Sequence, residues 1–251
     1  TSHELGQNFS KAFDIQFSDE NNKLKYPYQT SWGVSTRLVG MIIMAHGDNK
    51  GLRLPPKLAP FQVVIVPIFS DNNSKELVTK KVNEIHEELS KEFRVYLDER
   101  EELTPGYKFN EWEMKGVPLR IEIGPRDVES GSAVCARRDI DKSKSSIQFD
   151  SIRDEVRVLL DDIQTQMLKR TEAHREKNTI HVGSMEELIN TLNEKSGFVS
   201  CYWNENSDDE NRIKDLTKAT LRCYLIGTDK KEKSVNEKSK DGRLAIFSKA
   251  Y

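Results

Sequence analysis

The chain has 251 residues, with 41 acidic and 39 basic side chains, so its formal net charge at pH 7 is −2. Charged residues make up 32% of the sequence, hydrophobic residues 36%, and the mean hydropathy is −0.68. No apolar run approaches the roughly 20 residues that cross a bilayer, so the sequence excludes a membrane-spanning helix. The small net charge also excludes bulk attraction to nucleic acid, so an RNA partner must bind to a local patch.

Residues 1–58 predict a helix, two strands and a second helix. Phe9, Phe13 and Ile15 predict a core-facing turn that leads into a strand, and a further strand is expected around residues 26–32. From residue 35 to 46, apolar side chains recur at helical spacing. Pro55 and Pro56 then favour an extended exit, because a proline disfavours helix at the residue before it.

Residues 59–150 alternate strand and helix signals. The wholly apolar run at 62–68 is typical of a buried parallel strand. A helix follows, whose apolar face carries Val78, Val82, Ile85 and Leu89. Further strands are predicted at 94–97, 119–123 and 133–137, with a helix at 107–115 between the first two. This alternation predicts an α/β domain with a mixed sheet.

Residues 151–251 begin with a long predicted helix. Its apolar stripe consists of Ile152, Val156, Leu159, Ile163 and Met167. A small α+β unit is expected after it, with helices at 185–194 and 208–217, strands at 198–202, 220–225 and 244–247, and a polar loop at 228–241.

Three cysteines, Cys135, Cys201 and Cys223, lie far apart and form no Cys-x-x-Cys pair. Their odd number and wide spacing predict neither a disulfide framework nor a metal site. We expect ordinary buried or half-buried thiols in a reducing cytoplasm.

The stretch 29–37 is the candidate nucleotide site. Small hydroxyl residues and Gly33 stand where a strand passes into a helix, and Arg37 lies at the start of that helix. A helix N-terminus favours anions, and a guanidinium adds a fork suited to phosphate. By spacing alone the signal is weak, because a capped helix with one arginine is common.

Four long stretches resemble prolyl-tRNA synthetases in sequence and in order. They are residues 1–9 (TSHELGQNF), 29–40 (QTSWGVSTRLVG), 46–56 (HGDNKGLRLPP) and 104–127 (TPGYKFNEWEMKGVPLRIEIGPRD). The variety that the chain resembles is the eukaryote- and archaea-like one, whose members end in an extra domain.

The resemblance implies three parts. Residues 1–58 would be the end of a class II antiparallel-sheet catalytic domain with its motif 3, residues 59–150 an α/β anticodon-binding domain with a mixed sheet, and residues 151–251 a small α+β C-terminal domain. Such enzymes use ATP with Mg²⁺ to form prolyl-adenylate, and they then transfer the prolyl group to the 3′ end of tRNA(Pro).

The resemblance also implies the roles of the residues in the first part. Arg37 would pack on adenine and reach the γ-phosphate, with Ser35 and Thr36 beside the nucleotide. The pocket for proline and the tRNA end would contain Thr1, His3, Ser31, Trp32 and Gly33; a core aromatic is the alternative for Trp32. No residue is assigned a separate catalytic role, because the reaction rests on positioning and charge neutralisation.

For the anticodon we select Glu111, Lys115, Arg120 and Glu122. Proline anticodons share two guanines, whose edges suit carboxylates on one side and Arg or Lys on the other. Acidic side chains outnumber basic ones in residues 59–150, so recognition there must be site-directed. An ordinary solvated face is the alternative for each of these four charges.

The third part departs from the family pattern. Many relatives bind a structural zinc through four cysteines, where this chain has Asn204, Asp209, Ser234 and Glu237. Without thiolates we expect no zinc and no other metal site.

We therefore expect a cytoplasmic proline–tRNA ligase that forms a homodimer and has no membrane contact. The family's motifs 1 and 2 have no match in the chain, so we expect no prolyl-adenylate formation by it alone. Two alternatives stay open: a non-enzymatic RNA-binding module, and a paralogue that kept the fold but lost tRNA charging.

Overall fold

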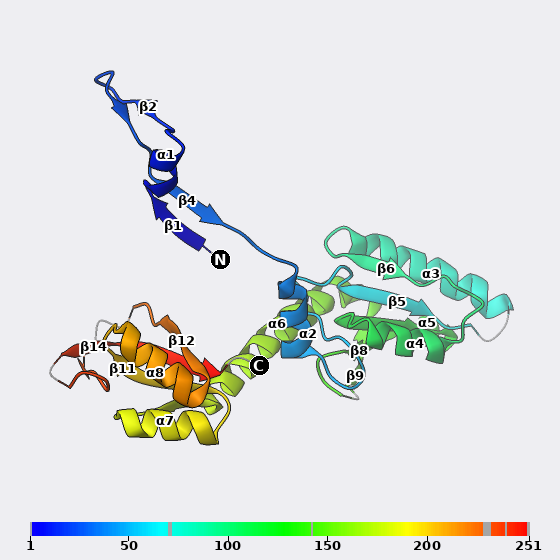
Figure 1. Cartoon of the computed structure of the whole chain (residues 1–251). Coiled ribbons are helices and arrows are strands. Elements are labelled where there is room, and N and C mark those ends of the chain that lie inside the picture. The colour runs from blue at the N-terminus through cyan, green and yellow to red at the C-terminus, as the bar shows by residue number, and fades with distance from the viewer. Residues whose placement is uncertain (1, 70–71, 142, 228–231, 239, 250–251) are drawn as a thin grey trace. The chain divides into compact units, whose positions relative to one another are not determined.

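A computed structural model describes residues 2–69, 72–141, 143–227, 232–238 and 240–249 (Figure 1). The chain forms two compact units, Thr1–Ile163 and Gln164–Tyr251. The three-part division at residues 58 and 150 stays a prediction.

The first unit is built on a mixed five-stranded sheet with the order β6-β5-β7-β8-β9. The strands are β5 (Val63–Pro67), β6 (Val95–Leu97), β7 (Leu119–Ile123), β8 (Ser132–Arg137) and β9 (Lys144–Gln148). β5 pairs in parallel with β6 and β7, whereas β7–β8 and β8–β9 are antiparallel. All five residues of β5 are buried, as expected for a central parallel strand covered on both faces. The predicted α/β fold with a mixed sheet is confirmed.

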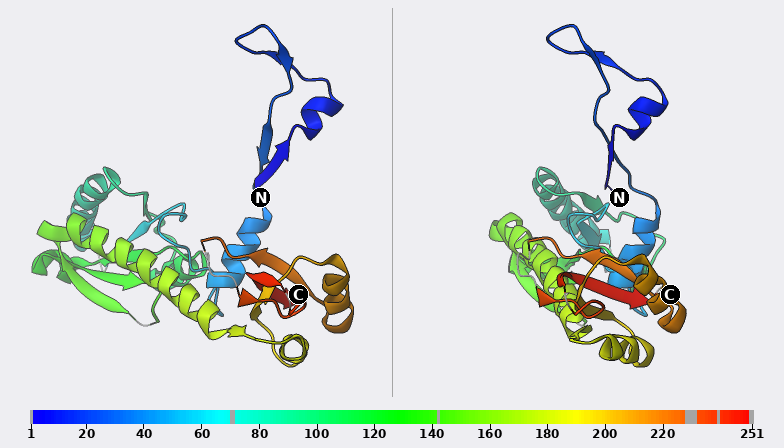
Figure 2. Two further views of the ribbon diagram at one scale, coloured as in Figure 1. Left: turned by 90° about the vertical axis from the view of Figure 1, so that its left-hand side faces the viewer. Right: turned by 60° about the vertical axis from the view of Figure 1, so that its left-hand side comes forward.

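Helices cover both faces of this sheet (Figure 1). They are α3 (Asn72–Ser90), α4 (Pro105–Met114), α5 (Pro125–Ser130) and α6 (Ile152–Lys177), the last preceded by a 3₁₀ turn, η1 (Phe149–Ser151). The predicted stripe of α3 packs on one face together with Ile152 and Val156 of α6, and Trp112 of α4 packs on the other face. α6 is one uninterrupted helix (Figure 2). In its stripe Leu160 is buried and Leu159 only half-buried, a shift of one position from the prediction.

A buried carboxylate fixes the loop that follows β6. Asp98 is fully buried and accepts hydrogen bonds from Arg100 Nε and Nη2 at 2.8 and 2.7 Å and from Trp112 Nε1 at 2.7 Å. The buried Lys108 donates from Nζ to the Asp98 carbonyl oxygen at 3.0 Å. Burial alone would raise the pKa of Asp98, but the hydrogen bonds from Arg100 and Trp112 outweigh it and lower the pKa to about 2. The carboxylate therefore stays ionised and holds α4 against the sheet.

The N-terminal segment contains short elements. They are β1 (Ser2–Gly6), α1 (Asn8–Ala12), β2 (Phe17–Ser18), β3 (Leu24–Lys25), β4 (Gln29–Trp32) and α2 (Arg37–His46). β1 pairs with β4, and β2 with β3, both antiparallel. The core-facing role predicted for Phe9, Phe13 and Ile15 was wrong for the described chain, because they are 48%, 71% and 45% exposed. α2 has no buried residue: Ile42 is half-buried, and its other large apolar side chains are exposed in the described chain.

The second unit is a small α+β fold, as predicted. Its strands and helices are β10 (Thr179–His181), α7 (Met185–Glu194), β11 (Phe198–Trp203), α8 (Ser207–Thr217), β12 (Ala219–Tyr224), β13 (Glu232–Lys233) and β14 (Asp241–Lys249). The sheet order is β10-β11-β14-β12, with β13 against β14. Leu188 and Leu192 of α7 and Ile213 of α8 share one core with Trp203 and Phe247. The predicted loop at 228–241 lies partly outside the described residues and contains β13.

The cysteine prediction is met only in part. Cys135 and Cys201 are buried, and burial raises the pKa of the Cys201 thiol to about 12. Cys223, however, is exposed on β12, where the strand leaves one face open.

Asn236 joins three segments at one end of the second unit. Its Oδ1 accepts from the backbone N–H of Asn204 at 3.0 Å, and its Nδ2 donates to the carbonyl oxygen of Asn204 at 2.8 Å and to Asp209 Oδ2 at 3.1 Å. Ser234 Oγ donates to Asn236 and accepts from the backbone N–H of Glu237. One amide side chain thus ties the end of β11, the first turn of α8 and the turn at 234–237 together.

No helix among the residues that the structure describes is long and apolar enough to cross a membrane.

Asp98→Asn should lower the free energy of unfolding of the first unit by about 3 kcal/mol, because it leaves Lys108 and Arg100 without their buried counter-charge. Hydrogen exchange of the β5 to β7 peptides measures the change. The matched control is Asp154→Asn, whose carboxylate is 70% exposed beside Arg157 and whose loss should cost less than about 1 kcal/mol.

The same carboxylate makes stability depend on pH. Because the pKa of Asp98 falls from its ordinary 3.8 to about 2 on folding, its contribution is complete above about pH 4 and is lost as the pH falls through about 2. In the wild-type chain this loss should amount to about 2 kcal/mol between these limits, and it should be absent in Asp98→Asn. Equal acid sensitivity of the two proteins would contradict it.

Asn236→Ala should destabilise the second unit by about 2 kcal/mol, because the backbone N–H and carbonyl of Asn204 lose their partners. Denaturant unfolding followed by the fluorescence of the buried Trp203 measures this. Asn193→Ala is the control, since Asn193 is exposed on α7 and its replacement should change stability by less than about 0.5 kcal/mol. Equal stability of the two variants would show that the hydrogen bonds of Asn236 do not stabilise the second unit.

Candidate functional site

A cavity of about 210 Å³ opens on the first unit between α4, β7, β8 and the turn at 48–51. It lies below the range of about 300–1,000 Å³ that suits drug-sized ligands, so it fits a single ring system. The residues that give it chemistry are Lys50, Trp112, Glu113, Arg120, Arg138 and Lys144. Positive side chains therefore dominate its lining, although the surrounding domain carries more acidic than basic residues.

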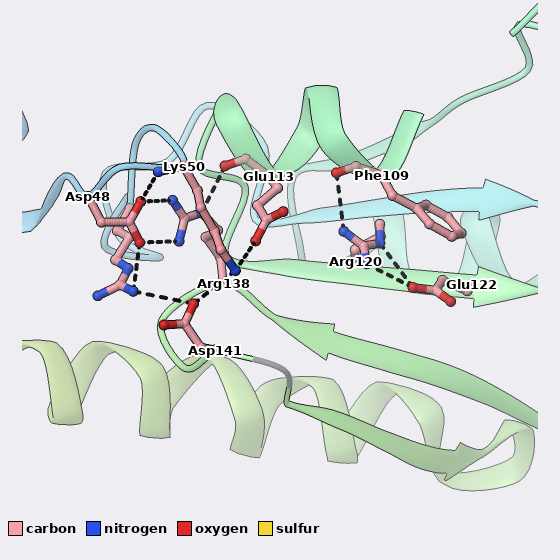
Figure 3. Close-up of polar contacts among 9 residues, drawn as sticks. Asp48, Lys50, Phe109, Glu113, Arg120, Glu122, Arg138 and Asp141 are labelled. Carbon is pink, nitrogen blue, oxygen red and sulfur yellow. Dashed lines mark hydrogen bonds and ion pairs between the residues drawn. The ribbon is translucent and has the colours of Figure 1, made fainter. Parts of the chain in front are cut away.

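Arg120 is held in the cavity by β7 and by two neighbours (Figure 3). Its Nη2 lies 2.9 Å from Glu122 Oε1, and its Nη1 donates to the carbonyl oxygen of Phe109 at 3.3 Å. Its guanidinium also lies 4.4 Å from the centre of the Phe109 ring. Glu122 is nearly buried, and its second oxygen accepts from Lys144 Nζ at 2.8 Å. One carboxylate thus orients two cations.

Glu113 stands in the last turn of α4 and lies across the cavity from Arg120 (Figure 3). Its Oε1 is 3.2 Å from Lys50 Nζ, which also lies 3.1 Å from Asp141 Oδ1. Hydrogen bonds to Asp141 and Glu113 raise the pKa of the Lys50 ammonium, so it stays charged. The cavity therefore offers the Glu113 carboxylate, next to Lys50, as an acceptor, and Arg120 and Lys144 as donors, beside the Trp112 ring. That arrangement suits a flat ligand with a donor edge and an acceptor edge.

The four residues predicted to read an anticodon lie in two places. Arg120 lines the cavity, and Glu122 supports it from β7. Glu111 instead pairs with Arg100 and Lys115, both at 2.7 Å, and the hydrogen bond from Arg100 lowers the pKa of Glu111. Lys115 packs its ammonium 4.5 Å from the centre of the Trp112 ring. Neither Glu111 nor Lys115 lines the cavity.

Sequence reasoning missed Glu113, Lys144, Lys50 and Arg138. Glu113 follows Phe109 by four residues, so both lie on one face of α4. Because Phe109 packs on Arg120, this spacing could have indicated that Glu113 lies on the side of α4 that faces Arg120. Lys50 and Arg138 gave no such signal, because they come from distant parts of the chain.

The residues predicted for proline and ATP lie on the N-terminal segment. Thr1 is outside the described residues. His3 of β1 pairs with Ser31 of β4, and Ser2 pairs with Trp32. The four residues therefore form two neighbouring cross-strand pairs of one two-stranded sheet. Trp32 is 80% exposed, so it is not a core aromatic of the described chain. Gly33 directly follows β4.

Arg37 begins α2, as expected, with Thr36 at the N-cap and Ser35 before it. All three residues are exposed in the part of the chain that the structure describes. Their side chains are free to contact a ligand, and their roles remain predictions.

The four positions at which the resemblance led us to expect missing zinc cysteines do come together. Asn204, Asp209, Ser234 and Glu237 all take part in the hydrogen bonds around Asn236. Within the described ranges, no group of three or more His, Cys, Asp or Glu side chains is placed to hold a metal ion. The side chains at these four positions are an amide, a hydroxyl and two carboxylates, without the thiolates that structural zinc sites use, and the absence of zinc stays a prediction.

Comparison with known proteins adds two domain assignments. The sequence profile described as "Anticodon binding domain" matches residues 62–159, and the profile described as "Prolyl-tRNA synthetase, C-terminal" matches residues 185–251. The first match contains the whole five-stranded sheet and the lining of the cavity except Lys50.

Individual relatives match along the whole chain. A proline–tRNA ligase of Natranaerobius thermophilus is 46% identical over all of this chain and 52% of its own length. A proline–tRNA ligase of Alkaliphilus oremlandii is 50% identical over 89% of this chain and 46% of its own length. The chain spans about half the length of the curated relatives it matches.

A solved structure is similar as well. The crystal structure of prolyl-tRNA synthetase from Cryptosporidium parvum, complexed with L-proline and AMP, superimposes with a TM-score of 0.86 at 36% identity. The alignment covers all of this chain and 54% of that one.

Proposed function

Because the chain belongs to the prolyl-tRNA synthetases, as the C-terminal portion of one, we propose that the whole protein is a proline–tRNA ligase. It activates proline with ATP to prolyl-adenylate and transfers the prolyl group to the 3′ end of tRNA(Pro). The observation that carries the proposal is the similarity to proline–tRNA ligases along the full 251 residues. The activity itself needs the other half of the relatives' length.

The contribution of the first unit is to read the anticodon. A guanine presents N1–H and N2–H₂ donors along one edge and the acceptors O6 and N7 along another. The Glu113 carboxylate suits the donor edge, and Arg120 and Lys144 suit the acceptors. The ring of Trp112 supplies an apolar wall. Splayed-out bases of a single-stranded loop are recognised in this way.

The contribution of the N-terminal segment is to bind ATP and proline. Arg37 packs on the adenine and neutralises phosphate charge, with Ser35 and Thr36 at the same helix start. His3 and Ser31, which pair across β1 and β4, line the pocket for proline and the tRNA end together with Thr1, Trp32 and Gly33. Among the described residues, the exposure of His3, Ser31, Trp32 and Gly33 leaves them accessible to a ligand held partly by the rest of the protein.

Mg²⁺ would enter with ATP and would neutralise phosphate charge during the attack of proline. The described residues place no cluster of carboxylates that fits it. We therefore assign no Mg²⁺ ligand to this chain, and we propose that its third domain needs no zinc. A homodimeric, cytoplasmic enzyme is part of the same proposal.

Glu113→Gln in the full-length protein should lower kcat/KM for tRNA(Pro) by about 5- to 100-fold, because the amide presents a donor to a guanine that itself donates. Aminoacylation of tRNA(Pro) transcripts measures this loss. Glu129→Gln, on an exposed position of α5, is the control and should behave as wild type. A Glu113→Gln enzyme that charges tRNA(Pro) at the wild-type rate would exclude this cavity as the anticodon site.

Arg37→Lys should reduce proline-dependent ATP–pyrophosphate exchange by at least about tenfold, because an ammonium neither stacks on adenine nor forms a bidentate contact with phosphate. Arg212→Lys, exposed on α8, serves as the control. The isolated 251-residue chain should give no exchange. Exchange by Arg37→Lys equal to that of Arg212→Lys would remove Arg37 from the ATP site.

A further inference from the structure

The turn that follows α2 forms one wall of the cavity. This turn is the segment Gly47–Leu54, and within it Asp48 and Gly51 form a β-bridge. Lys50, at its tip, lines the cavity and lies 3.2 Å from Glu113. The cavity is therefore complete only while this turn lies against α4.

Asp48 and Arg138 hold the turn in place by a bidentate ion pair (Figure 3). Arg138 Nη2 and Nη1 donate to Asp48 Oδ1 and Oδ2 at 2.6 and 3.0 Å, and Arg138 Nε donates to the carbonyl oxygen of Glu113 at 2.8 Å. The Arg138 side chain is only 5% exposed. Hydrogen bonding from Arg138 holds the pKa of Asp48 well below its ordinary value, so the pair stays charged at neutral pH. One arginine thus links the turn, the end of α4 and the lining of the cavity.

Backbone contacts also hold the turn against the end of α4. Leu52 N–H donates to the carbonyl oxygen of Met114 at 2.9 Å, and Leu54 N–H donates to that of Gly116 at 3.2 Å. Gly51 has φ +127°, and a Cβ there would lie 2.4 Å from the Met114 oxygen. Gly116 has φ +74°, and its Cβ would lie 2.6 Å from Leu52. Because neither glycine carries a side chain, the backbone of the turn can pack directly against the backbone at the end of α4.

We propose that the Asp48–Arg138 pair couples occupation of the cavity to the placement of α2, and that Asp48 is a positioning residue for the charging reaction. This inference rests on the proposed function, because it takes the occupant to be an anticodon base. A base needs the wall that carries Lys50, so it binds the docked turn more tightly than an undocked one. By linkage, the bound base stabilises docking, and docking fixes the end of α2 at His46.

The coupling acts along one short helix. α2 has 10 residues, about 15 Å, and Arg37 stands at its other end. Asp48 is not among the residues that line the cavity, so it acts on the reaction through the position of the turn and of α2. A tRNA with the correct anticodon should therefore place Arg37 better than one without it.

The test uses the full-length protein and its Asp48→Asn variant. Charging rates are measured with tRNA(Pro) and with a transcript whose two anticodon guanines are replaced, and ATP–pyrophosphate exchange is measured without tRNA. In the variant, kcat for native tRNA should fall at least about fivefold, toward the rate of the substituted transcript. Exchange without tRNA should fall less than charging of native tRNA does, because no base is then bound to add to the stability of the docked turn.

Three comparisons make the result specific. Glu92→Gln removes a bidentate partner of Arg157 on the exposed surface and should leave the ratio of the two charging rates unchanged. Asp48→Glu keeps the charge and should recover part of the ratio of the two charging rates. This variant also keeps the test informative if Asp48→Asn folds poorly. Glu113→Gln combined with Asp48→Asn should lower the ratio no further than Glu113→Gln alone, because both act on one coupling.

Two results would overturn the inference. An Asp48→Asn enzyme that still distinguishes the two transcripts as wild type does would show that the pair carries no coupling. Equal loss of exchange and charging, with a lower Tm, would show a purely structural pair. A wild-type protein without proline-dependent exchange would instead refute the proposed function, so the two failures are distinguishable.

Discussion

Every cation in the cavity of the first unit is held by a carboxylate, and this pairing determines what the site can bind. Glu122 orients Arg120 and Lys144, Asp48 orients Arg138, and Glu113 lies beside Lys50. Because each positive charge has a nearby partner, the cavity exerts little long-range attraction on an anion. Its selectivity comes from the direction of hydrogen bonds in a partly enclosed space, where they are stronger than in water. A domain with excess negative charge can bind RNA only by such directed contacts.

The sequence was most informative where one face of an element is buried by its own domain. The run around Val64, the stripe on α3 and the helix at 185–194 were predictable, because the hydrophobic period reflects a cover that the same domain provides. The apolar residues Phe9 and Phe13 follow the same logic but are exposed, because the described chain supplies no cover for them. Short elements such as α5 and β9 were missed, since six or five residues give little period to detect.

The site was harder to predict than the fold because its lining is assembled from distant segments. Arg120 was identifiable, since it lies on a clear strand within a long family-like stretch. Lys50 and Arg138 are separated by almost ninety positions and meet only because Gly51 and Gly116 let two backbones touch. The second unit shows another such case: nothing in the sequence indicated that Asn236 joins the end of β11, the first turn of α8 and the turn at 234–237. An amide can join three segments without a metal, at the cost of weaker individual bonds.

The exposed apolar side chains of α2 have a practical consequence for anyone who purifies this chain. Leu38, Val39, Met41, Ile43 and Met44 are all between 45% and 64% exposed, so one short helix presents five large apolar side chains to water. Exposed apolar surface promotes self-association. Self-association, rather than failure of either unit to fold, should limit the concentration at which the isolated chain stays in solution. Mild detergent, or polar replacements of these exposed side chains of α2, would then improve its solubility without disturbing the sheets.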